Sequence, residues 1–82
     1  MRSTRDRIVA IIADIAERKG VVVTTVPDEA DLYRGGVGLD SLDTAEFSVL
    51  LEEEFGHDPY SRGTFPRTLA ETLVYYERST AP

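Results

Sequence analysis

Apolar residues recur at helical spacing in three stretches of the chain, residues 3–19, 40–55 and 66–78. In the first stretch the isoleucines follow the i, i+3, i+4, i+7 spacing that places side chains on one helical face: Ile8, Ile11, Ile12 and Ile15. Ser3 can cap the start of this stretch, and Gly20 is a stop signal after its end. We therefore predict a helix in each of the three stretches.

The third predicted helix, residues 66–78, carries Pro66 in its first turn, a position that tolerates proline. Four of its residues share one face, which we expect to be buried: Leu69, Thr72, Leu73 and Tyr76. Its two tyrosines, Tyr75 and Tyr76, are expected to form core and rim of this helix, with a paired binding site as the alternative.

The connections between these helices are unequal. Residues 21–39 form a long loop in which three valines have strand propensity but find no second strand to pair with. We expect a helical turn near residues 28–33, and apolar anchors to the core at Val23, Val26, Leu32 and Leu39. Residues 57–64 are rich in turn residues and are expected to hold a short helix. The prediction is an all-α single domain spanning residues 1–82, a small antiparallel bundle of three long helices plus one short helix.

The middle helix, residues 40–55, has two apolar stripes. Phe47, Leu51 and Phe55 form the expected core face. The second stripe, Leu42, Ala45 and Val49, lies on a different side of the helix. Either this helix is buried on two sides, or the second stripe is left exposed for a partner.

The charges of the middle helix favour an exposed stripe. Three glutamates, residues 52–54, occupy its last turns, where the negative end of the helix dipole disfavours them. No Lys or Arg occurs from Leu39 to the residue before Arg62. These glutamates are either a solvated face or, together with Asp43 and Glu46, an acidic rim that meets Lys or Arg on partners.

Composition narrows the function. The chain has 15 Asp plus Glu, 9 Lys plus Arg and a formal net charge of −6, which argues against a nucleic-acid binder. Its apolar runs are too short for a membrane span or a signal core. With no cysteine, one histidine and no metal-ligand cluster, it lacks the groups of a thiol enzyme or metalloenzyme. We expect a soluble, cytoplasmic monomer that is not an enzyme. His57 is expected to be a solvated loop residue or a partner of the negative end of the helix dipole.

The start of the middle helix places a hydroxyl in a special position. Asp40 is a good N-cap candidate, and Ser41 would be the first helical residue. A phosphate attached to Ser41 would lie in the favourable field of the helix N-terminus. Taken alone, Asp-Ser is also an ordinary helix start.

The wider sequence around this serine carries more information. Gly-Leu-Asp-Ser-Leu-Asp at residues 38–43, followed by Leu-Glu-Glu-Glu-Phe-Gly at residues 51–56, closely resembles the acyl carrier protein family. The resemblance implies that Ser41 is modified with 4′-phosphopantetheine from coenzyme A and that Asp40 assists this modification. The resemblance and the acidic rim together give a partner surface: Leu42, Asp43, Ala45, Glu46, Val49 and Glu53.

The chain departs from the fatty-acid carriers of this family after Gly56, where residues 57–68 lack the usual Ile-Pro-Asp-Glu run. We therefore expect a free-standing, pathway-specific carrier of polyketide-type or other secondary-metabolite biosynthesis. Its partners would be a phosphopantetheinyl transferase and acyl-loading, condensing or tailoring enzymes with basic docking surfaces. The alternatives are a peptidyl or aminoacyl carrier and an unmodified, carrier-like interaction module. Arg62 and Arg67 are surface residues or contacts to the arm.

Overall fold

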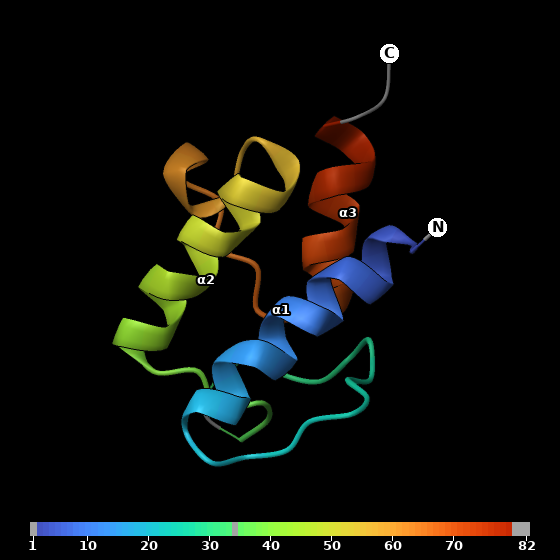
Figure 1. The fold of residues 1–82 in the computed structure, drawn as a ribbon. Helices are drawn as coiled ribbons and strands as arrows, with labels where there is room; N and C mark the ends of the chain where they lie inside the picture. Colours follow the sequence, from blue (N-terminus) through green and yellow to red (C-terminus); the bar gives the residue numbers. More distant parts are fainter. Residues whose placement is uncertain (1, 34, 80–82) are drawn as a thin grey trace.

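The computed structural model describes residues 2–33 and 35–79, and within them the only regular elements are helical (Figure 1). Three α-helices, α1 (Thr4–Arg18), α2 (Ser41–Phe55) and α3 (Leu69–Ser79), are joined by two loops. The second loop holds a single 3-10 turn, η1 (Tyr60–Arg62). The prediction of an all-helical chain is confirmed, with α1 and α2 of 15 residues, α3 of 11 and one 3-10 turn in place of a fourth α-helix.

Helix α1 packs against both other helices; it runs roughly opposite to α2 and crosses α3 obliquely (Figure 1). The Ser3 side chain caps its start by accepting a hydrogen bond from the Asp6 N–H at 3.1 Å, as predicted. Ile8, Ile12 and Ile15 are buried, as their spacing requires. None of the described helices is long and apolar enough to cross a membrane.

Helix α2 turns its predicted core face toward α1. Phe47 and Leu51 are fully buried, and Phe55 is half-buried against the same core. The helix ends at Gly56, whose φ of 87° is a left-handed conformation that glycine adopts without steric cost. The remaining core side chains come from the first loop and from α3: Val26, Leu32, Leu39, Leu69, Leu73 and Tyr76.

Helix α3 begins three residues later than predicted, so the placement of Pro66 in its first turn is wrong. Pro66 is buried in the preceding connection, and the helix is capped by Thr68, whose hydroxyl accepts from the Glu71 N–H at 3.1 Å. The first-turn N–H of Ala70 donates to the backbone carbonyl of Asp28 at 2.9 Å. The first loop therefore supplies an acceptor that the helix itself cannot provide.

The long loop of residues 21–39 is pinned to the segment before α3. Asp31 and Thr68 form an isolated antiparallel bridge, and the Leu32 N–H donates to the Arg67 carbonyl at 2.7 Å. Of the helical turn predicted near residues 28–33, the described part of this loop has a single turn, in which the Ala30 N–H donates to the Pro27 carbonyl at 3.1 Å. It does not continue as a helix, because the Leu32 N–H bonds across to Arg67. The predicted anchors are confirmed: Val26, Leu32 and Leu39 are buried and Val23 is partly buried.

Candidate functional site

Ser41 is the first residue of α2, and the residues around it fix the direction in which the chain enters the helix. Asp40 and Asp43 form a capping box: the Asp40 side chain accepts from the Asp43 N–H at 2.8 Å, and the Asp43 side chain accepts from the Asp40 N–H at 3.1 Å. Gly38, with a φ of 90°, makes the turn that leads into this cap. The exposed hydroxyl of Ser41 takes no part in the cap, so the helix start is held without it.

A hollow of about 720 Å³ lies beside this serine. Its walls come from the end of the first loop and the first turn of α2: Tyr33, Gly38, Leu39, Asp40, Ser41 and Thr44. Thr44 bonds back to the Asp40 carbonyl through its hydroxyl at 2.8 Å. Ser41 is therefore the lining hydroxyl that remains available at the edge of this hollow.

Lys19, at the end of α1, supplies positive charge to this end of α2. Its Nζ lies 2.6 Å from Asp43 Oδ2 and 3.9 Å from Asp40 Oδ2. The hydrogen bond from Lys19 holds the pKa of Asp43 below its usual range, and the same bond raises the pKa of Lys19. The structure thus places Asp43 inside the cap, whereas the prediction had grouped it with the partner surface.

The second stripe of α2 is not covered by the described residues. Leu42 is 79% exposed, Val49 is 53% exposed, and Ala45 lies exposed between them. The alternative of a helix buried on two sides is therefore wrong. An uncovered apolar stripe on one helix is the feature that a docking partner would cover.

The acids of α2 have intramolecular partners that the sequence did not reveal. Arg18 pairs with Glu46, and Arg7 Nε lies 2.6 Å from Glu54 Oε2. The sequence around α2 offers these acids no local cation, and the partners of Glu46 and Glu54 come instead from α1. Glu52 and Glu53 form no ion pair with any residue the structure describes.

Asp58 is a buried carboxylate that sequence reasoning missed. Its side chain accepts from Ser48 Oγ and Ser61 Oγ, each at 2.6 Å, and from the Ser61 N–H at 3.1 Å. Burial opposes its charge, but these bonds outweigh burial and lower its pKa. An Asp three residues before a Ser, with Pro59 between them, is a turn signal that could have revealed it.

The aromatic residues outside α2 have structural partners. His57 Nδ1 lies 2.9 Å from the Tyr75 hydroxyl, and the Tyr76 hydroxyl donates to the His57 carbonyl at 2.9 Å. His57 is thus partly buried against α3, so the expectation of a solvated loop residue is wrong, while the expectation of a residue beside the C-terminal end of α2 stays a prediction. Within the described chain, no cluster of residues is arranged to hold a metal ion.

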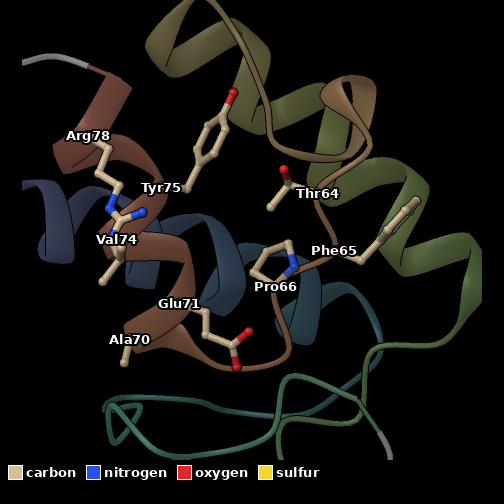
Figure 2. A pocket seen from close by; sticks show the side chains of 8 residues that line it. All are labelled: Thr64, Phe65, Pro66, Ala70, Glu71, Val74, Tyr75 and Arg78. Atoms are coloured by element: carbon tan, nitrogen blue, oxygen red, sulfur yellow. The ribbon is translucent and has the colours of Figure 1, made fainter.

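A second hollow of about 570 Å³ lies along the outer side of α3. Figure 2 shows its lining: residues 64–66 on one side, and Ala70, Glu71, Val74, Tyr75 and Arg78 from α3 on the other. It shares no lining residue with the hollow beside Ser41. This groove is therefore separate from the candidate site.

An exposed serine at a capped helix start, next to an uncovered apolar stripe, is an arrangement suited to a carrier domain. The family model described as "Phosphopantetheine attachment site" matches residues 6–62, a range that includes Ser41. The chain belongs to the acyl carrier protein family. Members of this family are carriers and not enzymes, and their cofactor is covalently attached 4′-phosphopantetheine.

A curated relative supports the same assignment. The chain is 32% identical over 75 residues to "Acyl carrier protein, mitochondrial" of Dictyostelium discoideum. The match covers 90% of this chain and 58% of the relative, so the chain spans little more than half of that protein's length. No solved structure gave a significant match.

Proposed function

We propose that this chain is an acyl carrier domain in which Ser41 carries the 4′-phosphopantetheine arm. The observation that carries this proposal is the placement of Ser41: its hydroxyl is exposed at the first position of α2, while Asp40 and Asp43 hold the helix start without it. The bound arm supplies a terminal thiol on which acyl groups are held as thioesters. The chain has no cysteine and therefore no thiol of its own.

The residues around Ser41 fit a phosphate diester. The N–H groups of the first turn of α2 have no intrahelical acceptors, and the positive end of the helix dipole lies there. Lys19 adds a cation near the cap. The Asp40 side chain is 63% exposed, and only its Oδ1 is bound to the Asp43 N–H. Asp40 Oδ2 has only the 3.9 Å ion pair with Lys19 Nζ, and the exposed carboxylate can assist the transferase that attaches the arm.

The proposed partner surface is the exposed stripe of α2 with the acids beside it. Leu42, Ala45 and Val49 provide apolar contact. Glu53 provides unpaired negative charge within the described chain, and Glu46 lies beside the stripe in its ion pair with Arg18. Such a surface fits a phosphopantetheinyl transferase and acyl-loading, condensing or tailoring enzymes that present apolar sockets with Lys or Arg around them.

The finer assignment rests on the sequence after α2. Residues 57–68 differ from the run typical of fatty-acid carriers, which supports a pathway-specific carrier of polyketide-type or other secondary metabolism. We propose that the chain acts in the cytoplasm. We also propose that it is a monomer, since its uncovered apolar stripe is narrow and its net charge of −6 opposes self-association.

Intact-mass measurement tests the attachment residue. After incubation with coenzyme A and a promiscuous transferase, the chain should gain the mass of one phosphopantetheine. Ser41→Ala should gain none, and its free energy of unfolding should change by no more than about 0.5 kcal/mol, since the residue is exposed. Thr44→Ala, which removes another hydroxyl of the same turn, is the matched control and should still be modified.

Two results would contradict the proposal. If the unchanged chain gains no mass with an active transferase, the chain is an unmodified interaction module. If Ser41→Ala still gains the arm, another hydroxyl is the attachment residue. Loading with acyl and aminoacyl donors then separates an acyl carrier from an aminoacyl carrier.

A further inference from the structure

One aromatic residue, Tyr33 of the first loop, lines the hollow beside Ser41. Tyr33 lines this hollow together with Ser41, although the two residues belong to different segments of the chain. The side chain is half-buried and packs against the core. Tyr33 is the one aromatic residue among the six that line the hollow.

The ring of Tyr33 is held firmly in place. Its hydroxyl donates to the Pro66 carbonyl at 2.9 Å and lies 2.8 Å from the Tyr60 hydroxyl, from which it accepts. Its backbone N–H donates to Asp31 Oδ1 at 2.8 Å, and Asp31 is itself bridged to Thr68. The ring is therefore in position before anything enters the hollow, which lowers the entropy lost on contact.

These bonds decide what Tyr33 offers to the hollow. The single hydroxyl proton is used on Pro66, and Tyr60 occupies an acceptor position of the same oxygen. What remains for a ligand is the apolar surface of the ring. Tyr60 is fixed in turn by edge-to-face contacts, with Phe47 at 6.2 Å and with Phe65 at 6.0 Å between ring centroids.

One part of the arm, its pair of methyl groups, is suited to contact an aromatic ring. One CH2 group beyond its phosphate ester oxygen, the pantetheine chain carries a quaternary carbon with two methyl groups, and its hydroxyl and amides come after this carbon. Because the phosphate would be tethered at Ser41, the methyl-bearing carbon is the first part of the arm to reach the hollow. Packing methyl groups on an aromatic ring removes apolar surface from water.

We propose that Tyr33 is a positioning residue for the arm: its ring receives the two methyl groups and directs the arm along the first loop. This inference rests on the proposed attachment at Ser41. Under this proposal the first loop, and not only α2, determines the direction in which the arm and its cargo leave Ser41. The bridge between Asp31 and Thr68, which fixes the first loop, would then also hold the ring of Tyr33 in place.

Isotope-filtered NMR on the modified protein tests the contact directly. The protein is labelled with ¹³C and ¹⁵N, and the arm is attached unlabelled from coenzyme A. We expect cross-peaks between the methyl protons of the arm and the ring protons of Tyr33, with the methyl signals shifted by the ring current. Intact mass is measured first, so failure of attachment is separated from failure of the contact.

Two variants separate positioning from a purely structural role. Tyr33→Leu keeps an apolar side chain but removes the ring, so the ring-current shift of the arm methyls should disappear. Tyr60→Phe removes one hydrogen-bond partner of Tyr33 and leaves the ring and its bond to Pro66, so that shift should remain. Thermal unfolding of the unmodified forms reports any loss of stability on its own.

The proposal is overturned if the modified, unchanged chain shows no contact between the arm and Tyr33. It is also overturned if Tyr33→Leu leaves the methyl shifts unchanged. If Tyr33→Leu does not fold, the cross-peaks in the unchanged chain decide the matter.

Discussion

At the scale of single residues, Asp43 shows what a sequence can and cannot predict. The capping role of its neighbour Asp40 follows from local spacing, and the structure places that cap where the spacing predicted it. The ion pair between Asp43 and Lys19 joins residues 24 positions apart, and it depends on how α1 packs on α2. Local pattern holds no record of that packing, so Asp43 was grouped with exposed acids.

The Asp43–Lys19 pair predicts a pH-dependent stability. Because the folded pKa of Asp43 is lowered, its contribution is complete above its ordinary pKa of about 3.9 and is lost as the pH falls through the lower folded value. Asp43→Asn should therefore be less stable than the unchanged chain at neutral pH. The difference should shrink steadily below about pH 4, as measured by urea denaturation across a pH series.

Glu52→Gln is the matched control for this experiment. Glu52 lies on the same helix and is exposed, with no ion pair to a described residue. Its removal should leave the pH dependence of stability nearly unchanged. A gap between Asp43→Asn and the unchanged chain that stays constant down to pH 2 would contradict the assigned role of the ion pair.

At the scale of elements, α2 combines a buried face and an uncovered one. Helical periodicity predicted the buried face correctly, since Phe47 and Leu51 are fully buried. It could not decide whether the second stripe is covered, because that depends on where α3 lies. The structure shows a ring contact between α3 and the C-terminal end of α2, where the ring centroids of Phe55 and Tyr76 lie 4.3 Å apart. The stripe from Leu42 to Val49 is left open.

Two leucines on this helix should respond very differently to the same substitution. Leu51→Ala opens a cavity in the core and should cost about 2–5 kcal/mol of unfolding free energy. Leu42→Ala removes a side chain that is 79% exposed and should change stability by no more than about 0.5 kcal/mol. Denaturant unfolding measures both.

Partner binding should show the reverse order. Leu42→Ala should weaken association with the transferase, because it removes apolar contact from the proposed docking stripe. Comparable losses of stability in Leu42→Ala and Leu51→Ala would mean that the stripe belongs to the fold and is not a free surface.

At the scale of the whole molecule, ion pairs within the chain determine which acids keep an uncompensated negative charge. Cations of α1 and its C-cap form ion pairs with three acids of α2. Lys19 pairs with Asp43 at the start of α2, Arg18 with Glu46 in its middle, and Arg7 with Glu54 near its end. The excess of acids that the composition revealed is therefore partly neutralised along the seam between α1 and α2. Glu52 and Glu53 retain charge that is unpaired within the described chain.

This distribution predicts which acids steer partners. Glu53→Gln should lower the association rate with the transferase a few-fold at low salt, and it should weaken the salt dependence of that rate. Glu54→Gln should have a smaller effect, because Arg7 already neutralises this carboxylate. The association rates can be measured by stopped flow between about 0.01 and 1 M ionic strength. Over this range the electrostatic screening length falls from about 30 to about 3 Å.

Equal effects of the two substitutions would show that the pairing seen with Arg7 does not decide which charge a partner meets. A rate that is insensitive to salt in the unchanged chain would remove the steering role altogether.

The contacts between the first loop and the start of α3 have a consequence for protein engineering. The family match ends at residue 62, but the loop is held by Arg67 and Thr68, and it caps α3 at Ala70. A fragment cut at the end of the matched region would lose those contacts, together with the three core side chains Leu69, Leu73 and Tyr76. The piece that can be transplanted into another protein is thus longer than the motif by which it is identified, and a functional graft has to include all of α3.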